Sequence, residues 1–114
     1  MKHTEDDNQK ALFQWAKYKP ELMWLHAIPN GGKRNYKEAV RLKAQGVKSG
    51  VWDIFLPVAK HGYHGLYIEM KAGKNKLTEN QHLFGDFAHK QGYLTHTAYS
   101  WLEAKKVITE YMEF

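Results

Sequence analysis

Residues 50–71 decide the fold of this chain; they read G-V-W-D-I-F-L-P-V-A-K-H-G-Y-H-G-L-Y-I-E-M-K. Two short apolar runs flank a bend that contains glycine and histidine, which predicts a β-hairpin with a loop longer than two residues. Because side chains alternate along a strand, Glu69 and Lys71 should share one face of the second strand. The opposite face should carry three apolar residues, Leu66, Ile68 and Met70.

Asp53 stands on the first strand of this hairpin, between Trp52 and Ile54, an unusual setting for a carboxylate. An unpaired buried charge is costly, so we expect Asp53 to have a partner, most economically a cation. Asp53 and Glu69 would supply two hard oxygen ligands for Mg²⁺ or Mn²⁺, and the main-chain carbonyl of Met70 could add a third. The hairpin therefore predicts a compact metal site.

A divalent metal at this position would lower the pKa of a bound water and offset charge on a phosphate oxygen. Lys71 would then orient the attacking water or stabilise the oxyanion of the transition state. Taken alone, Glu69-x-Lys71 is a common tripeptide and fits a surface hairpin with a Glu–Lys pair. Adding Asp53, its apolar setting and the basic chain favours a metal-dependent nuclease.

The composition limits the class of protein. The chain has 114 residues and no cysteine, which excludes a disulfide framework and a thiolate zinc site. We expect one domain over residues 1–114. No stretch approaches the ~18 apolar residues of a membrane span, and the N-terminus is acidic, unlike a signal peptide. These features predict a soluble, cytoplasmic protein, with no membrane partner.

The net charge of +5 favours a polyanionic partner, and its distribution strengthens that inference. Basic residues gather on both sides of the hairpin, and we take as candidate DNA-binding residues Lys33, Arg34, Lys37, Arg41, Lys48, Lys74 and Lys76. The main-chain N–H groups of Asn30–Gly32, with the basic pair after them, could cradle a phosphate or simply form a turn. Lys37 and Arg41 lie four residues apart on a predicted helix, where like charges repel and a polyanion would relieve the repulsion.

The rest of the chain predicts an α/β fold with the order α-β-α-β-β-α-β-α, a mixed central sheet flanked by helices. We expect helices over 4–18, 36–45 and 78–91 and from 100 onward, and strands over 22–28, 52–56, 66–71 and 93–98. In the second helix, the inner side is assigned to Tyr36, Ala39, Val40 and Leu42. The tryptophans are expected in the core, although Trp52 could border the DNA path. The chain has no cysteine, and its histidines have no Asp or Glu partner at ligand spacing, so the sequence does not favour a structural zinc site.

Four stretches of this sequence resemble one nuclease family. They are H-A-I-P-N-G-G-K-R-N (26–35), R-L-K-A-Q-G-V-K-S-G-V-W-D-I-F-L-P-V (41–58), H-G-L-Y-I-E-M-K (64–71) and L-T-E-N-Q (77–81). Together they resemble the VRR-NUC nucleases, the virus-type branch of the restriction-endonuclease-like PD-(D/E)xK superfamily. The resemblance runs from about Glu5 to about Trp101, and stand-alone members of this size are typically phage or prophage products.

This resemblance implies divalent-metal-dependent cleavage of structured DNA, with homodimers acting on four-way (Holliday) junctions. It also implies that Gln81 lies near the site, although Gln81 is fully explained as the third residue of a helix capping box. A first-helix acid, here Glu5, often joins the metal in this superfamily; a solvated acidic helix start explains it equally well. Trp52 departs from the family pattern, which usually has proline before the catalytic aspartate, and this affects loop geometry more than chemistry.

Two other functions stay open at this point. One is a flap or nicking nuclease of the same fold, which differs from a junction resolvase only in substrate. The other is a DNA-binding module without catalysis. Asp53, Glu69 and Lys71 are all present, which argues against the second, because a degenerate nuclease usually loses one of the three. A product of a phage would act in the cytoplasm of its host cell.

Overall fold

The computed structural model describes residues 4–29 and 35–113, and it shows the predicted α/β architecture. The described residues form four α-helices and four strands. The helices are α1 (Glu5–Ala16), α2 (Tyr36–Ala44), α3 (Glu79–Lys90) and α4 (Trp101–Met112), and the strands are β1 (His26–Ala27), β2 (Ile54–Leu56), β3 (Leu66–Met70) and β4 (Leu94–Ala98). No helix within the described ranges is long and apolar enough to cross a membrane.

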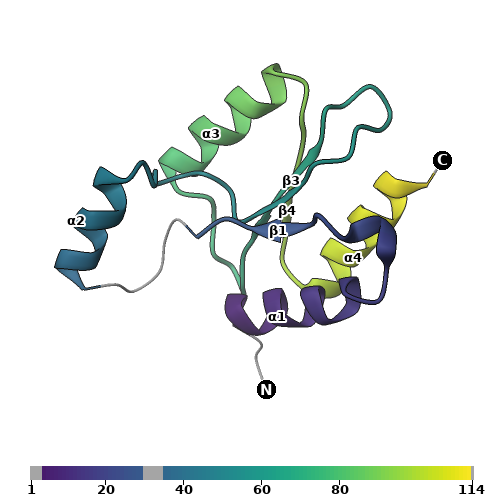
Figure 1. The fold of residues 1–114 in the computed structure, drawn as a ribbon, viewed down its shortest axis with the longest axis horizontal. Helices are drawn as coiled ribbons and strands as arrows, with labels where there is room; N and C mark the ends of the chain where they lie inside the picture. Colours follow the sequence, from purple (N-terminus) through teal and green to yellow (C-terminus); the bar gives the residue numbers. More distant parts are fainter. Residues whose placement is uncertain (1–3, 30–34, 114) are drawn as a thin grey trace.

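The sheet is mixed, and its strands follow the order β1-β2-β3-β4. Strand β2 pairs antiparallel with β1 and with β3, so the predicted hairpin is present. Strand β3 pairs in parallel with β4, the product of a crossover through α3. Figure 1 shows α1 and α4 together on one side of the sheet and α3 on the other.

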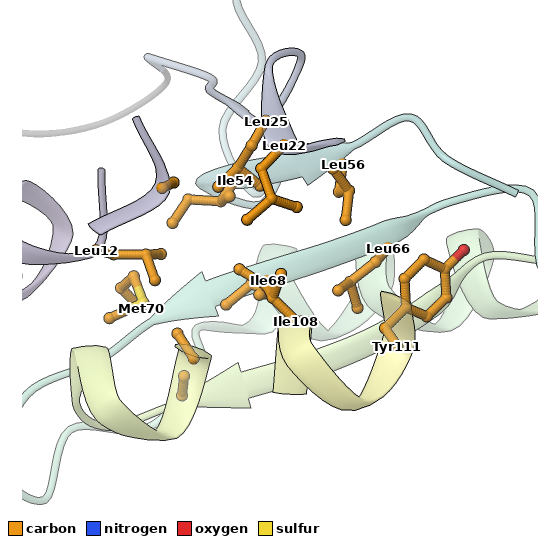
Figure 2. Close-up of a cluster of buried hydrophobic side chains, with 13 residues drawn as sticks. Leu12, Leu22, Leu25, Ile54, Leu56, Leu66, Ile68, Met70, Ile108 and Tyr111 are labelled. Atoms are coloured by element: carbon orange, nitrogen blue, oxygen red, sulfur yellow. The ribbon is translucent and has the colours of Figure 1, made fainter. Parts of the chain in front are cut away.

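The hydrophobic core lies between the sheet and the α1–α4 pair. Strand β3 contributes Leu66, Ile68 and Met70, all at most 1% exposed, as the alternation of its side chains predicts. Figure 2 shows them packed against Leu12 of α1 and Ile108 of α4. The buried Asn8 side chain joins the two helices, because its Oδ1 accepts a hydrogen bond from the main-chain N–H of Trp101 at 3.0 Å. Because Leu66, Ile68 and Met70 face this core, Glu69 lies on the opposite face of β3.

The segment after α1 differs from the predicted strand over 22–28. Residues Pro20–Leu22 form a 3-10 helix, and only His26–Ala27 pair as a strand. Leu22 and Leu25 are buried three residues apart, so this segment follows helical rather than strand periodicity. The tryptophans also divide: Trp52 is buried, whereas Trp24 is 71% exposed.

Helix α2 has the predicted position but not the predicted packing. Asn35 caps it, with Oδ1 accepting from the main-chain N–H of Glu38 at 2.7 Å. None of its residues Tyr36–Ala44, all of them described, is buried, and Tyr36 is 83% exposed. The inner side assigned to Tyr36, Ala39 and Val40 is therefore wrong: these side chains are exposed, and Leu42 is half-buried. Figure 1 shows α2 standing apart from the sheet and the other helices.

Candidate active site

The register of the hairpin brings Asp53 and Glu69 together. Ile54 pairs with Ile68, so Asp53, in a bend just before β2, faces Glu69 across the two strands. The main-chain N–H of Asp53 donates to Glu69 Oε1 at 3.1 Å. In return, the main-chain N–H of Met70 donates to Asp53 Oδ2, also at 3.1 Å. Two reciprocal hydrogen bonds thus hold the two carboxyl groups at one end of the hairpin.

Burial and mutual repulsion make this pair hold a proton. Glu69 is 2% exposed, and burial, followed by the neighbouring charge of Asp53, raises its pKa to about 8. Burial also raises the pKa of the half-buried Asp53, although its hydrogen bond to the Glu69 side chain opposes that change. Two carboxylates this close cannot both ionise without cost. The pair therefore carries less than two negative charges near neutral pH unless a cation joins it.

Lys71 extends the same face of β3 and is 7% exposed. Its Nζ lies 3.7 Å from Glu69 Oε2, and its charge acts to lower the pKa of Glu69. One ammonium does not offset the effects of burial and of Asp53, since the pKa of Glu69 stays raised. A buried lysine beside two carboxyl groups is the arrangement that the Asp53…Glu69-x-Lys71 pattern predicts.

Gln81 unites the two roles that its sequence position allows. Its Oε1 accepts from the main-chain N–H of Thr78 at 2.9 Å, while Thr78 Oγ1 accepts from the N–H of Gln81, completing the capping box of α3. Its Nε2 donates to Glu69 Oε2 at 3.1 Å. The amide of Gln81 therefore both caps the helix and contacts the site.

Trp52 packs beside this site. The sequence did not decide whether Trp52 lies in the core or borders the DNA. The ring is 4% exposed, so Trp52 does not line an open path for DNA. Its Nε1–H donates to the main-chain carbonyl of Gln81 at 2.8 Å. A Cβ at Gly85 would lie 2.6 Å from Trp52 Cζ2, so the ring occupies the space that a side chain at residue 85 would need. Glycine inside a helical pattern, as at Gly85, was the available indication of such close packing.

The first turn of α1 approaches the site without completing it. Glu5 is half-buried and lines a surface hollow together with Lys74 and Tyr99. The charge of Asp6, the next residue, acts on Asp53 and raises its pKa slightly further. Within residues 4–29 and 35–113, no three His, Asp or Glu side chains gather as metal ligands, so Glu5 does not join Asp53 and Glu69 in one cluster.

The donor set suits a hard divalent cation. Asp53 and Glu69 offer carboxylate oxygens, the ligands that Mg²⁺ and Mn²⁺ prefer, and Mg²⁺ commonly uses one or two carboxylates and retains water and phosphate ligands. The pKa of Glu69 stays raised despite Lys71, so the ionised form of the carboxyl pair is not fully stabilised by that ammonium. A cation here would supply that compensation. We found no comparable group among the described histidines, and His61 instead contacts the main-chain carbonyl of Tyr111 at 2.9 Å.

The described candidate DNA-binding residues are all exposed. Two lie on α2, one in the loop before β2 and two after Lys71: Lys37, Arg41, Lys48, Lys74 and Lys76. The loop that carries Lys48 rests on the start of α3, where Asn80 Nδ2 donates to Ser49 Oγ at 3.2 Å. Lys33 and Arg34 lie outside the described residues. The basic residues therefore reach solvent on the segments that flank the hairpin in sequence.

Comparisons with known proteins agree on one family. Residues 2–101 match the model of the VRR-NUC domain. A solved structure described as a VRR_NUC domain protein is similar to this chain, with a TM-score of 0.84 and 29% sequence identity over 98% of this chain and 90% of the other. No curated protein gave a match. With the family model covering nearly the whole chain and a matching fold, this protein belongs to the VRR-NUC family, whose domains are nucleases.

Proposed function

We propose that this chain is a divalent-metal-dependent DNA endonuclease that hydrolyses phosphodiester bonds in branched DNA. In this proposal Asp53, Glu69 and the main-chain carbonyl of Met70 hold Mg²⁺ or Mn²⁺, and Lys71 and Gln81 act beside them. Glu5 would contribute through water rather than directly, given its place in the neighbouring hollow. Family membership supports nuclease activity. The chemistry of the site supports the metal, and the resemblance to stand-alone VRR-NUC nucleases supports the substrate and the assembly.

The observation that carries the proposal is the buried Asp53–Glu69–Lys71 cluster. A protein does not gain stability by burying two carboxyl groups against each other, since desolvation and repulsion both oppose it. Here those effects raise the pKa of Glu69 to about 8. Such perturbed carboxyl groups are typical of functional sites, where a ligand present during function offsets the cost. A divalent cation is the ligand that fits these oxygens.

The bound metal would supply Lewis acidity toward a phosphate oxygen and acidify a water. Lys71 stands next to Glu69, and its ammonium would stabilise charge that develops on the phosphate or orient the attacking water. Gln81 fixes Glu69 Oε2 through its amide nitrogen, which leaves Oε1 to the main-chain N–H of Asp53. Every oxygen of Glu69 therefore has a fixed direction before substrate arrives, which is the preorganisation that catalysis needs.

We propose a four-way junction as the substrate and a homodimer as the active form. One chain carries one Asp53–Glu69 pair, whereas resolving a junction requires two symmetric cuts, which a two-fold dimer would supply. The resemblance to stand-alone VRR-NUC nucleases supports the same assembly. The exposed residues Lys37, Arg41, Lys48, Lys74 and Lys76, together with Lys33 and Arg34, would bind the DNA backbone.

A substrate panel tests the proposal. End-labelled four-way junction, flap and linear duplex are incubated with wild type, Lys71→Ala or Lys106→Ala, in Mg²⁺, Mn²⁺ or EDTA. Lys106 is an exposed lysine of α4 and serves as the matched control. We expect paired symmetric cuts in the junction that need metal, fall roughly 10²–10³-fold in Lys71→Ala and persist in Lys106→Ala.

Other outcomes change the proposal in defined ways. Cuts confined to flaps or to one strand would keep the chemistry and remove the junction as substrate. Binding without cutting in either metal would leave a DNA-binding module. Equal cleavage by Lys71→Ala and wild type would contradict the assignment of the site.

A further inference from the structure

Trp52 lies between the hairpin and α3, beside the carboxyl pair. The side chain is 4% exposed and precedes Asp53 directly. A buried indole needs a partner for its N–H, and Trp52 finds it 29 residues along the chain, at the carbonyl of Gln81. This is a tertiary contact to the first turn of α3, the turn that carries the side chain facing Glu69.

The contact fixes the position of Gln81 in two ways. In an α-helix the carbonyl of residue 81 accepts from the N–H of residue 85, so the indole uses the second lone pair of that oxygen. The ring edge meets the helix at Gly85, one turn further, where even a Cβ would come within 2.6 Å of Cζ2. A hydrogen bond at Gln81 and close packing at Gly85 together define how far α3 lies from the strand.

Residues 52 and 53 therefore hold both oxygens of Glu69. Oε1 accepts from the main-chain N–H of Asp53. Oε2 accepts from the side chain of Gln81, whose main chain is held by Trp52. If the indole released Gln81, the second hydrogen bond would lose its fixed geometry while the first remained. The effect would appear in the direction of the Glu69 carboxylate before it appeared in the overall fold.

We propose that Trp52 is a positioning residue, which acts through the main chain of Gln81 to set the orientation of the Glu69 carboxylate for a divalent cation. In this role Trp52 would act without contacting the metal or DNA. Residues that orient a metal ligand from behind typically change metal affinity about 10–100-fold when removed. Trp52 acts one contact further away, and we expect roughly a three- to tenfold change. The inference rests on the metal site of the proposed function.

The test separates the hydrogen bond from the bulk of the ring. Trp52→Phe keeps an aromatic ring against Gly85 and removes the N–H. Gly85→Ala keeps the N–H and displaces the ring. Trp101→Phe is the matched control, because Trp101 is a half-buried residue of α4, on the other side of the sheet. For each protein we would measure Mn²⁺ affinity by calorimetry without DNA, and the melting temperature in EDTA.

We expect Mn²⁺ dissociation constants roughly three- to tenfold higher in Trp52→Phe and Gly85→Ala, and unchanged in Trp101→Phe. At saturating Mn²⁺, the single-turnover cleavage rate of Trp52→Phe should return close to the wild-type rate, because the ligands themselves are intact. Wild-type Mn²⁺ affinity in Trp52→Phe would overturn the inference. So would an equal loss of affinity in Trp101→Phe, since the effect would then follow stability.

Three outcomes remain, and they are distinguishable. If Trp52→Phe does not fold, Gly85→Ala decides, and wild-type Mn²⁺ affinity in the folded Gly85→Ala protein would overturn the inference. If wild type itself binds no Mn²⁺, the proposed metal site fails and this inference fails with it. Intact binding in wild type and in Trp52→Phe would overturn the role of Trp52 alone.

Discussion

Helices α2 and α3 begin with the same kind of cap but have very different surroundings. Each begins at a capping residue whose side chain accepts from the main chain three residues on, Asn35 in α2 and Thr78 in α3. Helix α3 is fixed to the hairpin through Trp52 and Gln81, whereas no residue of Tyr36–Ala44, a fully described range, is buried. Caps and an apolar pattern define a helix locally, but they do not say whether another element packs against it.

We therefore expect α2 and α3 to have different roles in the proposed nuclease. Helix α3 should control metal binding and catalysis, because Gln81 contacts Glu69. Helix α2 carries exposed Lys37 and Arg41 and has no buried residue over Tyr36–Ala44, so we expect it to control DNA affinity. Substitutions on the two sides should therefore change different measured quantities.

The largest effect should come from Asp53→Asn. The change removes a charged ligand and keeps the size of the side chain, so we expect the single-turnover cleavage rate to fall by more than about 10²-fold. DNA affinity in EDTA should stay equal or rise, since a negative charge is lost. Asp86→Asn, at an exposed position of α3, is the control and should match wild type. Cleavage by Asp53→Asn at the wild-type rate would place the active site elsewhere.

The pKa of Glu69 predicts how stability depends on pH without metal. The folded-state pKa is about 8, above the ordinary glutamate value of 4.5, so the native state holds this proton more tightly than the unfolded state. Stability from Glu69 is then fully present below about pH 4.5 and lost as pH rises to about 8. Urea unfolding in EDTA should show Glu69→Gln gaining roughly 2–4 kcal/mol on wild type between pH 5 and pH 8.5. A difference that stays constant with pH would contradict the raised pKa.

A smaller effect should separate the two roles of Gln81. Gln81→Ala removes the contact to Glu69 and half of the capping box, and we expect cleavage to fall roughly 10–100-fold. Thr78→Ala removes a cap without touching Glu69, so it should cost about 1 kcal/mol of stability and little rate. Measuring single-turnover rates and urea midpoints for both distinguishes catalysis from capping. Equal rate losses would reduce Gln81 to a capping residue.

The smallest effect on chemistry should come from α2. Lys37→Ala with Arg41→Ala should weaken DNA binding several-fold and reduce the salt-dependence slope by about 2, one for each lost phosphate contact. Mn²⁺ affinity should not change. Binding is measured across a salt series in EDTA, with Lys106→Ala as the control on α4. An unchanged salt slope would place the DNA away from α2.

The hairpin was predictable because its information is local. Alternation of side chains over Leu66–Met70 gives the buried face, and the spacing of Thr78 and Gln81 gives the start of α3. The strand predicted over 22–28 is present but much shorter than predicted, because Leu22 and Leu25 enter the core with helical spacing and only His26–Ala27 pair. The unpacked state of α2 could not be foreseen, because packing depends on whether another element reaches that helix.

In the candidate site, too, the local features were predictable from the sequence and the tertiary contacts were not. Asp53, Glu69 and Lys71 come from two strands of one hairpin, and their meeting follows from its register. The contact of Trp52 with Gln81 joins residues 29 positions apart, and no local pattern indicates it except a glycine at residue 85. On α1, successive residues point about 100° apart. The sequence named Glu5 alone as the acid of α1, and it did not show that Glu5 would line the hollow while the charge of Asp6 acts on Asp53.

The most direct test of the central claim is Mn²⁺ calorimetry on wild type and Glu69→Gln, without DNA, at pH 7 in two buffers of different ionisation enthalpy. Because the pKa of Glu69 is about 8, wild type should release about half to one proton for each Mn²⁺ bound, and its affinity should rise with pH. Glu69→Gln should bind far more weakly and release no proton. Equal affinity in both proteins, with no proton released by wild type, would contradict a metal site built on the Asp53–Glu69 pair.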